Sequence, residues 1–267
     1  MQELEVELAK ARFARRHVSK MAGIGLAALV ARMTMVKPAH ADADGDNDDD
    51  DNDEEGRQCF LKGTRIRTIT GEREVEDLAI GDLLPTRFNG LQPIQWIGRH
   101  RFTRSDRSRP WVRNVRPVRI ARSALAPDVP HSDLYVSQQH AIFIDGLLVR
   151  VGSLVNDATI ALADADDVGE LEYYHIKLQS HDVIEAEGAP CETLLQVEES
   201  AANFADYLRM YGAPNEPAQP CAPVLSFYSN HSRVKSHLRS ALSPWVDRRE
   251  TIDIIRDRLE RRALTMA

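Results

Sequence analysis

The sequence CFLKGTRIRTITGEREVEDLAIGD runs from Cys59 to Asp82. Between Thr64 and Thr70, β-branched residues alternate with Arg65, Arg67 and Ile69, which is the period-two pattern of a strand. Gly71 then marks a turn. Cys59 stands directly between a polar upstream run and this β-rich region. Since nothing buried lies upstream to clash, its sulfur can reach the peptide carbonyl of Gln58. The pattern predicts a β domain that begins at a cysteine with access to its own preceding peptide bond.

The charge of the chain is unevenly distributed. The 267 residues carry a formal net charge of −7, and the run from Asp42 to Glu55 holds ten acidic residues and no basic one. Taking those ten charges from −7 leaves +3, so the remaining chain is near neutral and nucleic acid is not an expected partner. The hydrophobic content of 43% is ordinary for a soluble globular protein.

Residues 1–41 have the features of an export signal. Arg15-Arg16-His17-Val18-Ser19-Lys20 resembles the twin-arginine motif, an apolar run from Met21 to Ala31 follows, and Ala39-His40-Ala41 offers a cleavage site. The apolar run is shorter than the roughly 20 residues that cross a bilayer. We therefore expect export to the periplasm or the exterior, with no membrane span after signal removal. The alternative is an amphipathic helix from Glu3 to Lys20.

Residues 42–58 form an acidic linker. Its like charges repel one another and it offers no large apolar side chain to bury, so we expect it to be disordered. Part of it matches the spacing of a calcium-binding EF-hand loop, at positions one, three, five and twelve: Asp44, Asp46, Asp48 and Glu55. Asp49 occupies position six, where the sharp turn requires glycine, and no helices flank the run. Calcium or surface binding by this linker stays an alternative function.

Residues 59–196 have the periodicity of an all-β domain. Asn89-Gly90 and Asp145-Gly146 are dipeptides that accept the positive φ of hairpin turns. Arg101 to Arg113 is polar and basic, and is predicted to be a surface loop. The predicted strands, after the one that contains Thr64–Thr70, are Ile94–Ile97, Val115–Ile120, Leu134–Val136, Ala141–Ile144, Leu147–Val151, Glu172–Leu178 and Val183–Ala186.

Residues 197–267 are predicted to be a C-terminal extension. Ala201 to Met210 favours a short helix, and three prolines between Asn215 and Pro223 indicate a loop. Trp245 to Met266 has apolar residues at helical spacing and arginines on the opposite face, which predicts a terminal helix that packs on the β domain.

Four pieces of the sequence together resemble the Hint family, which comprises hedgehog autoprocessing domains and inteins. The bacterial, hedgehog-like branch is the most similar. The pieces follow the order of that family and span residue 59 to about residue 195. They are Cys59, the pair Gly63-Thr64 with Glu76-Asp77-Leu78 and Gly81-Asp82, the block Ser137-Gln138-Gln139-His140, and the block from His175 to Asp182.

The resemblance implies a reaction at the Gln58–Cys59 bond. Cys59 would attack the carbonyl of Gln58 and form a thioester, and His140 would protonate the leaving amide nitrogen, because a histidine titrates near ~6.5. Ser137 would hydrogen-bond the scissile amide. In the late block, the implied role of His181 is to polarise the carbonyl or to move the proton, with Asp182 orienting it.

Each of these residues also has a structural interpretation. Cys59 could form a disulfide with Cys191 or Cys221 in an oxidising compartment. His140 could be a buried histidine with satisfied hydrogen bonds, and Asp182 could cap a turn. His175 alternates with apolar residues on a predicted strand, which favours a structural role.

The sequence also limits the reaction. Inteins finish splicing at a His-Asn pair, and this chain contains none, so protein splicing is not expected. The prediction is an autoprocessing domain that cleaves before Cys59 and passes the thioester to an acceptor left open as water, a thiol, an amine or a hydroxyl compound. The alternative is a secreted Hint-fold module without chemistry. No cysteine or histidine spacing matches a zinc site, so no metal or cofactor is expected.

Overall fold

The computed structural model of the chain describes residues 58–104, 109–165, 168–197, 204–213, 218–225, 230–243 and 248–266. The chain divides into two units, Met1–Asn47 and Asp48–Ala267, and the described residues all belong to the second. The predicted export signal, residues 1–41, and the predicted linker up to residue 57 lie outside the described residues and stay predictions.

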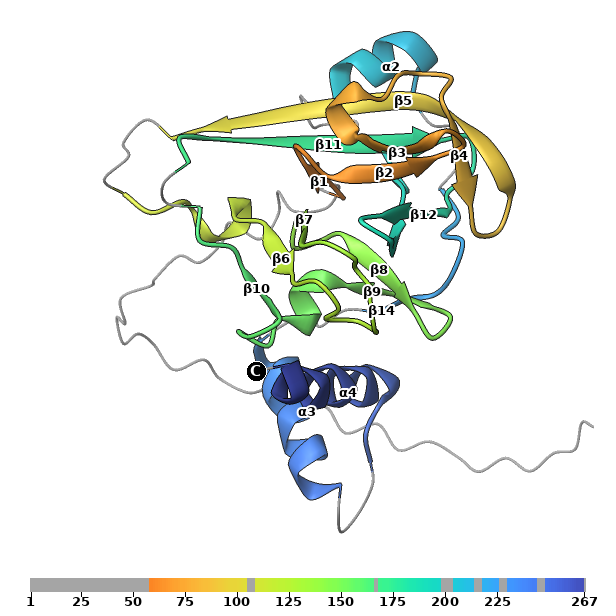
Figure 1. The fold of residues 1–267 in the computed structure, drawn as a ribbon. Helices are drawn as coiled ribbons and strands as arrows, with labels where there is room; N and C mark the ends of the chain where they lie inside the picture. The colour runs from red at the N-terminus through yellow and green to blue at the C-terminus, as the bar shows by residue number, and fades with distance from the viewer. Residues whose placement is uncertain are drawn as a thin grey trace, which may run out of the picture. The chain divides into compact units, whose positions relative to one another are not determined.

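Two seven-stranded sheets form the described fold (Figure 1). In spatial order, the first sheet contains β10 (Ile160–Leu162), β6 (Val118–Ile120), β7 (Leu134–Val136), β1 (Phe60–Leu61), β11 (Glu170–Leu178), β5 (Gly90–Thr103) and β4 (Leu83–Thr86). The second contains β14 (Val224–Leu225), β9 (Leu147–Arg150), β8 (Ala141–Ile144), β13 (Ala189–Glu192), β12 (Val183–Ala186), β2 (Arg65–Thr68) and β3 (Gly71–Glu74). The predicted all-β fold with a helical C-terminal extension is confirmed.

Both predicted hairpin dipeptides lie where neighbouring strands are joined. Asp145 and Gly146 have φ values of 52° and 84°, and they join β8 to β9. Gly90 has a φ of 70° and opens β5 after the turn from β4. Glu187-Gly188, with φ values of 49° and 74°, joins β12 to β13, a strand that the sequence did not predict.

β5 and β11 form a long antiparallel ladder, from the pair Thr103–Glu170 to the pair Ile94–Leu178 (Figure 1). The prediction of a loop from Arg101 to Arg113 is therefore wrong at its start, because β5 continues to Thr103. The basic residues on this strand face acidic residues on its neighbour: Arg101 Nε lies 3.1 Å from Glu170 Oε1. Cross-strand pairs of opposite charge stabilise a sheet, so a polar sequence can still form a strand.

Apolar side chains from both sheets form the main core. Its fully buried members include Phe60, Ile66, Ile142 and Ile176. Each such side chain contributes about 1.5–3 kcal/mol when it leaves water. Because Phe60 is anchored in this core, the residue immediately before it, Cys59, has a fixed position.

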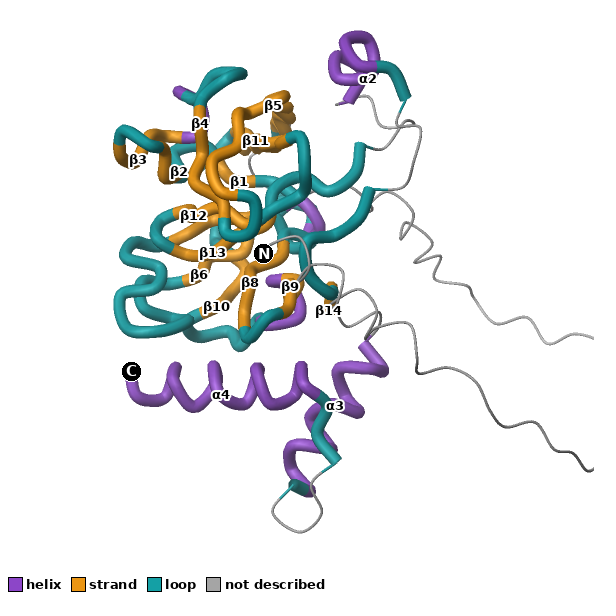
Figure 2. Tube along the Cα trace, turned by 90° about the vertical axis from the view of Figure 1, so that its right-hand side faces the viewer, coloured by secondary structure: helices purple, strands orange, loops and turns teal. Residues whose placement is uncertain are grey.

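The extension contains the helices α2 (Ala205–Tyr211), α3 (Asn230–Leu242) and α4 (Thr251–Met266). Figure 2 shows α4 as one uninterrupted helix. Ile252, Ile255 and Leu259 of α4 join the main core, so the helix packs on the β domain as predicted, although it begins six residues later than Trp245. The sequence did not predict α3. No helix among the described residues is long and apolar enough to cross a membrane.

Candidate active site

The sheet order brings the distant sequence blocks together at Cys59. β1 lies between β7 and β11, with Phe60 opposite both Val136 and Tyr174. The residue after β7 is Ser137, and the residue after Tyr174 is His175. Cys59, which precedes β1, is therefore placed between these two side chains, and only 4% of its surface is exposed.

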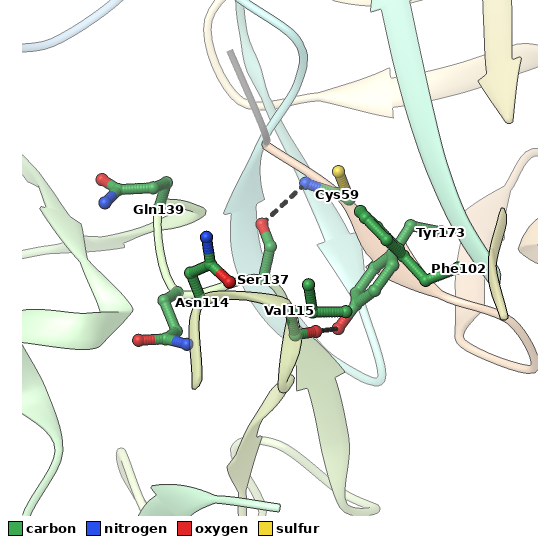
Figure 3. Close-up of a pocket in the computed structure, with 8 residues that line it drawn as sticks. Cys59, Phe102, Asn114, Val115, Ser137, Gln139 and Tyr173 are labelled. Carbon is green, nitrogen blue, oxygen red and sulfur yellow. Dashed lines mark hydrogen bonds between the residues drawn. The ribbon is translucent and has the colours of Figure 1, made fainter. Parts of the chain in front are cut away.

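The peptide bond between Gln58 and Cys59 is held on both sides. The Cys59 N–H donates to Ser137 Oγ at 3.1 Å (Figure 3), and the Ser137 N–H donates to the Cys59 carbonyl at 3.0 Å. On the other side, His175 Nδ1 lies 3.0 Å from the Gln58 carbonyl oxygen. Cys59 Sγ lies 3.5 Å from both ring nitrogens of His175. The nucleophile, the amide nitrogen and the carbonyl oxygen thus each have a defined partner.

The side chain of Gln58 is also fixed. Its Oε1 accepts a hydrogen bond from the Leu195 N–H at 3.0 Å. Lys177 Nζ in turn donates to the Leu195 carbonyl at 3.4 Å. The residue before the bond is thus bound by its side chain as well as by its carbonyl.

His175 is the site residue whose position the sequence interpretation missed. It is fully buried on β11, and its ring contacts Trp96 of β5 at a centroid distance of 6.4 Å and Phe204 at 5.2 Å. Phe204 precedes α2, so the C-terminal extension covers this histidine. The available signal was the period of the strand: Tyr173 and His175 lie two residues apart and share the face on which Cys59 lies.

His140 is completely buried, and its ring centroid lies 4.5 Å from that of Phe60. Burial lowers the pKa of His140 to about 3, and His175 and His181 act in the same direction. Neither ring nitrogen makes a hydrogen bond of ordinary geometry to a described residue. His140 is therefore neutral at pH 7. It was expected to be the proton donor because histidine ordinarily titrates near neutral pH, and its lowered pKa removes that reason.

The contacts described for His181 are to residues other than Cys59. Its Nδ1 accepts a hydrogen bond from the Cys221 N–H at 3.0 Å, and its Nε2 lies 3.5 Å from Glu192 Oε2. Glu192 Oε1 accepts from the Ala141 N–H at 2.7 Å, and burial raises the pKa of this carboxyl. We expected Asp182 to orient His181. The carboxylate beside His181 is instead that of Glu192, which no sequence block had indicated.

Asp182 fixes a loop. Its carboxylate, which is fully buried, accepts hydrogen bonds from the backbone of Phe88, Asn89 and Val183 and from the side chain of Gln92. Burial raises the pKa of this carboxyl, but the hydrogen bonds from Val183, Asn89 and Phe88 outweigh it, so the pKa lies below its ordinary value. The geometry agrees with the turn-capping interpretation.

Replacing Asp182 with alanine should destabilise the fold by about 3 kcal/mol, since each buried donor left without a partner costs about 1–3 kcal/mol. Because the pKa of Asp182 is lowered in the folded protein, its carboxylate contributes fully to stability above the unfolded pKa, about 3.9. This contribution to stability is lost as the pH falls through the folded pKa. Urea unfolding at pH 7 should show the full difference, and the difference should shrink below about pH 3.9. Asp77→Ala, at an exposed position, is the control and should stay within about 0.5 kcal/mol of wild type.

The described residues include all three cysteines, and no disulfide joins them. Burial raises the pKa of the Cys191 thiol, and it raises the pKa of Cys221 to about 11. No group of three or more metal-ligating side chains occurs within the described ranges.

A comparison with protein families identifies the domain that carries this site. A family model for the Hint domain matches residues 58–198, more than half of the chain. The chain belongs to the Hint domain family. This confirms the resemblance inferred from the sequence blocks, and it supports a self-processing Hint domain in general.

Three solved structures are similar to this Hint domain. A bacterial intein-like domain from Clostridium thermocellum is 12% identical with a TM-score of 0.37, and the match covers 51% of this chain and 99% of that one. The gp41-1 intein is 13% identical with a TM-score of 0.35, covering 50% and 97%. The MchDnaB-1 intein is 14% identical with a TM-score of 0.34, covering 49% and 98%. The comparison with curated proteins found no match.

Proposed function

We propose that this Hint domain cleaves its own chain between Gln58 and Cys59 by an N-to-S acyl shift. The observation that carries the proposal is the geometry at this bond. Ser137 holds the amide nitrogen, His175 Nδ1 lies against the carbonyl oxygen, and the Cys59 sulfur lies beside the same histidine. These contacts hold the attacking sulfur, the leaving nitrogen and the oxygen that takes up charge, all three around the Gln58 carbonyl carbon at which one bond forms and another breaks.

His175 serves the first step with both of its nitrogens. In its neutral form, with the proton on Nδ1, the N–H donates to the Gln58 carbonyl and polarises it. Nε2 is then bare and lies 3.5 Å from Cys59 Sγ, so it can take the thiol proton. The sulfur bonds to the carbonyl carbon, and the Nδ1–H stabilises the negative charge that develops on the oxygen.

The second step breaks the carbon–nitrogen bond. The proton that left the thiol returns to the Cys59 nitrogen, so the products are a thioester and a free amine, with no net loss of a proton. His140 lies beside the Cys59 backbone, whose hydrogen bond raises the pKa of the ring against the larger effect of burial, and this position suits His140 to relay the proton to the Cys59 nitrogen. Because His140 starts neutral, charging His175 does not place two cations together in a buried site.

The hydrogen bond from Leu195 to Gln58 should make cleavage sensitive to the residue before the bond. Gln58→Ala loses a hydrogen bond worth about 0.5–1.5 kcal/mol, so we expect cleavage to slow by roughly 2- to 10-fold. Gln58→Glu keeps an acceptor oxygen at the same position and is the matched control. Rates measured by gel densitometry should put the Glu variant near wild type, whereas an Ala variant as fast as wild type would contradict this anchoring role.

Intact mass of the purified protein, with and without a strong thiol, tests the proposed function. A thioester is far easier to attack than an amide, so an added thiol should release a fragment that begins at Cys59. A folded chain that keeps its full mass under this challenge would favour the alternative, a Hint-fold module without chemistry.

Export of the protein is proposed from its sequence alone. The twin arginines, the short apolar run and Ala39-His40-Ala41 support a signal that is removed before residue 42. Under this proposal, cleavage before Cys59 would release only the acidic segment.

A further inference from the structure

A small pocket borders Cys59 on the side of Ser137 and Tyr173 (Figure 3). Its volume of about 20 Å³ has room for a water molecule. The lining residues are Cys59, Phe102, Asn114, Val115, Ser137, Gln138, Gln139 and Tyr173.

The described residues that line this pocket are apolar or uncharged. Phe102, Val115 and Tyr173 supply the apolar side, while the other side carries the amides of Asn114 and Gln139 (Figure 3). Gln138 also lines the pocket. The Tyr173 hydroxyl donates to the Val115 carbonyl at 2.7 Å, and burial raises its pKa well above the ordinary value, with Cys59 acting in the same direction. A charged ligand would lose hydration here without gaining an ion pair from the lining residues.

The wall opposite β11 is fastened in place. Gln138 Nε2 donates to the carbonyls of Arg113 and Arg116 at 2.6 and 3.2 Å, and the Tyr173 hydroxyl donates to the carbonyl of Val115, which lies between them in the sequence. The Arg116 guanidinium donates to the Ala163 carbonyl, and Trp111 Nε1 donates to the Ala165 carbonyl at 3.0 Å. Opening the pocket for a larger molecule would break several of these hydrogen bonds together.

We infer that this pocket admits the acceptor that resolves the thioester, and that it selects a small, neutral nucleophile, with water as the natural one. This inference rests on the proposed function. The water oxygen bonds to the Gln58 carbonyl carbon, the carbon–sulfur bond breaks, and the proton released from water goes to the Cys59 sulfur. The products are the free carboxylic acid of Gln58 and the thiol of Cys59, so the upstream segment is released by hydrolysis.

Two amines of the same chemistry but different size test the pocket. Hydroxylamine and O-benzylhydroxylamine attack through the same nitrogen, and their intrinsic rates can be measured on a small free thioester in solution. After that correction, the wild-type protein should react with hydroxylamine at least about 10-fold faster, which is the discrimination expected of a site one group too small. Equal corrected rates would overturn the inference, because the acceptor would then not pass through this pocket.

A variant with a wider pocket should lose this preference for the smaller amine. Phe102→Ala should bring the two corrected rates within about 3-fold of each other, while Phe102→Leu should keep most of the difference. Val115→Ala is the second variant if the first does not fold. A widened pocket with an unchanged ratio would also overturn the inference. Absence of any cleavage by hydroxylamine in the folded wild type would instead contradict the proposed function, so the two failures are distinguishable.

Discussion

Replacing Cys59 with alanine is expected to abolish cleavage completely. The sulfur is the atom that forms the thioester, and within the described residues the contacts that hold the scissile peptide place no other thiol beside it. Losing one small side chain should leave the fold intact, because Cys59 is followed directly by the anchored Phe60. Incubation with hydroxylamine and measurement of intact mass should therefore give only the full-length chain.

The control for this prediction is Cys221→Ala, which removes a thiol from the extension. Its backbone N–H, not its sulfur, contacts His181, so cleavage should continue at close to the wild-type rate. If Cys59→Ala were cut as readily as wild type, the cut would come from a contaminating protease acting on an exposed segment, and the acyl-shift proposal would fail.

Replacing His175 with alanine should slow cleavage by about 100- to 10,000-fold, the usual effect of losing a general acid or base. This side chain both polarises the Gln58 carbonyl and lies within reach of the Cys59 thiol, so its loss removes two contributions to the same step. His175→Gln separates them. Glutamine can still donate to the carbonyl but cannot accept the thiol proton as a base, so we expect it to remain slow, although faster than alanine.

The matched control is His131→Ala. His131 contacts Glu72 and Ser132 rather than the scissile peptide, so its loss should change the rate less than about 3-fold. Melting curves establish that each variant is folded, which matters because His175 is completely buried. A folded His175→Ala protein that cleaves at the wild-type rate would show that this residue has only a structural role, as its strand pattern alone had favoured.

The sequence predicted the fold well where local and tertiary preferences agree. Leu134–Val136, Ala141–Ile144 and Val183–Ala186 are β-branched or apolar runs between turn residues, and each is a strand with those bounds. β13 was missed because Pro190 stands inside it and reads as a break. The basic end of β5 was missed because its charges are matched by residues of β11 that are distant in the sequence.

The site was predictable in part, for a similar reason. The order of the sequence blocks located Cys59, Ser137 and His140, since β1 lies next to β7. It favoured His181 over His175, whereas His175 is the histidine that contacts the Cys59 sulfur, because which of the two faces the sulfur depends on the register of β11 against β1. The burial that makes His140 neutral also depends on tertiary packing, and the ordinary pKa of histidine gives no sign of it.

The central claim is that the bond between Gln58 and Cys59 is broken, and that its cleavage proceeds through an intermediate with the acyl group on the Cys59 sulfur. Hydroxylamine captures such an acyl group as a hydroxamate, so mass spectrometry of both fragments reads the chemistry directly. The proposal predicts an upstream fragment that ends in a Gln58 hydroxamate and a downstream fragment that begins at Cys59. A folded wild-type chain that stays at full length through a day in hydroxylamine, or fragments that meet at another bond, would contradict it.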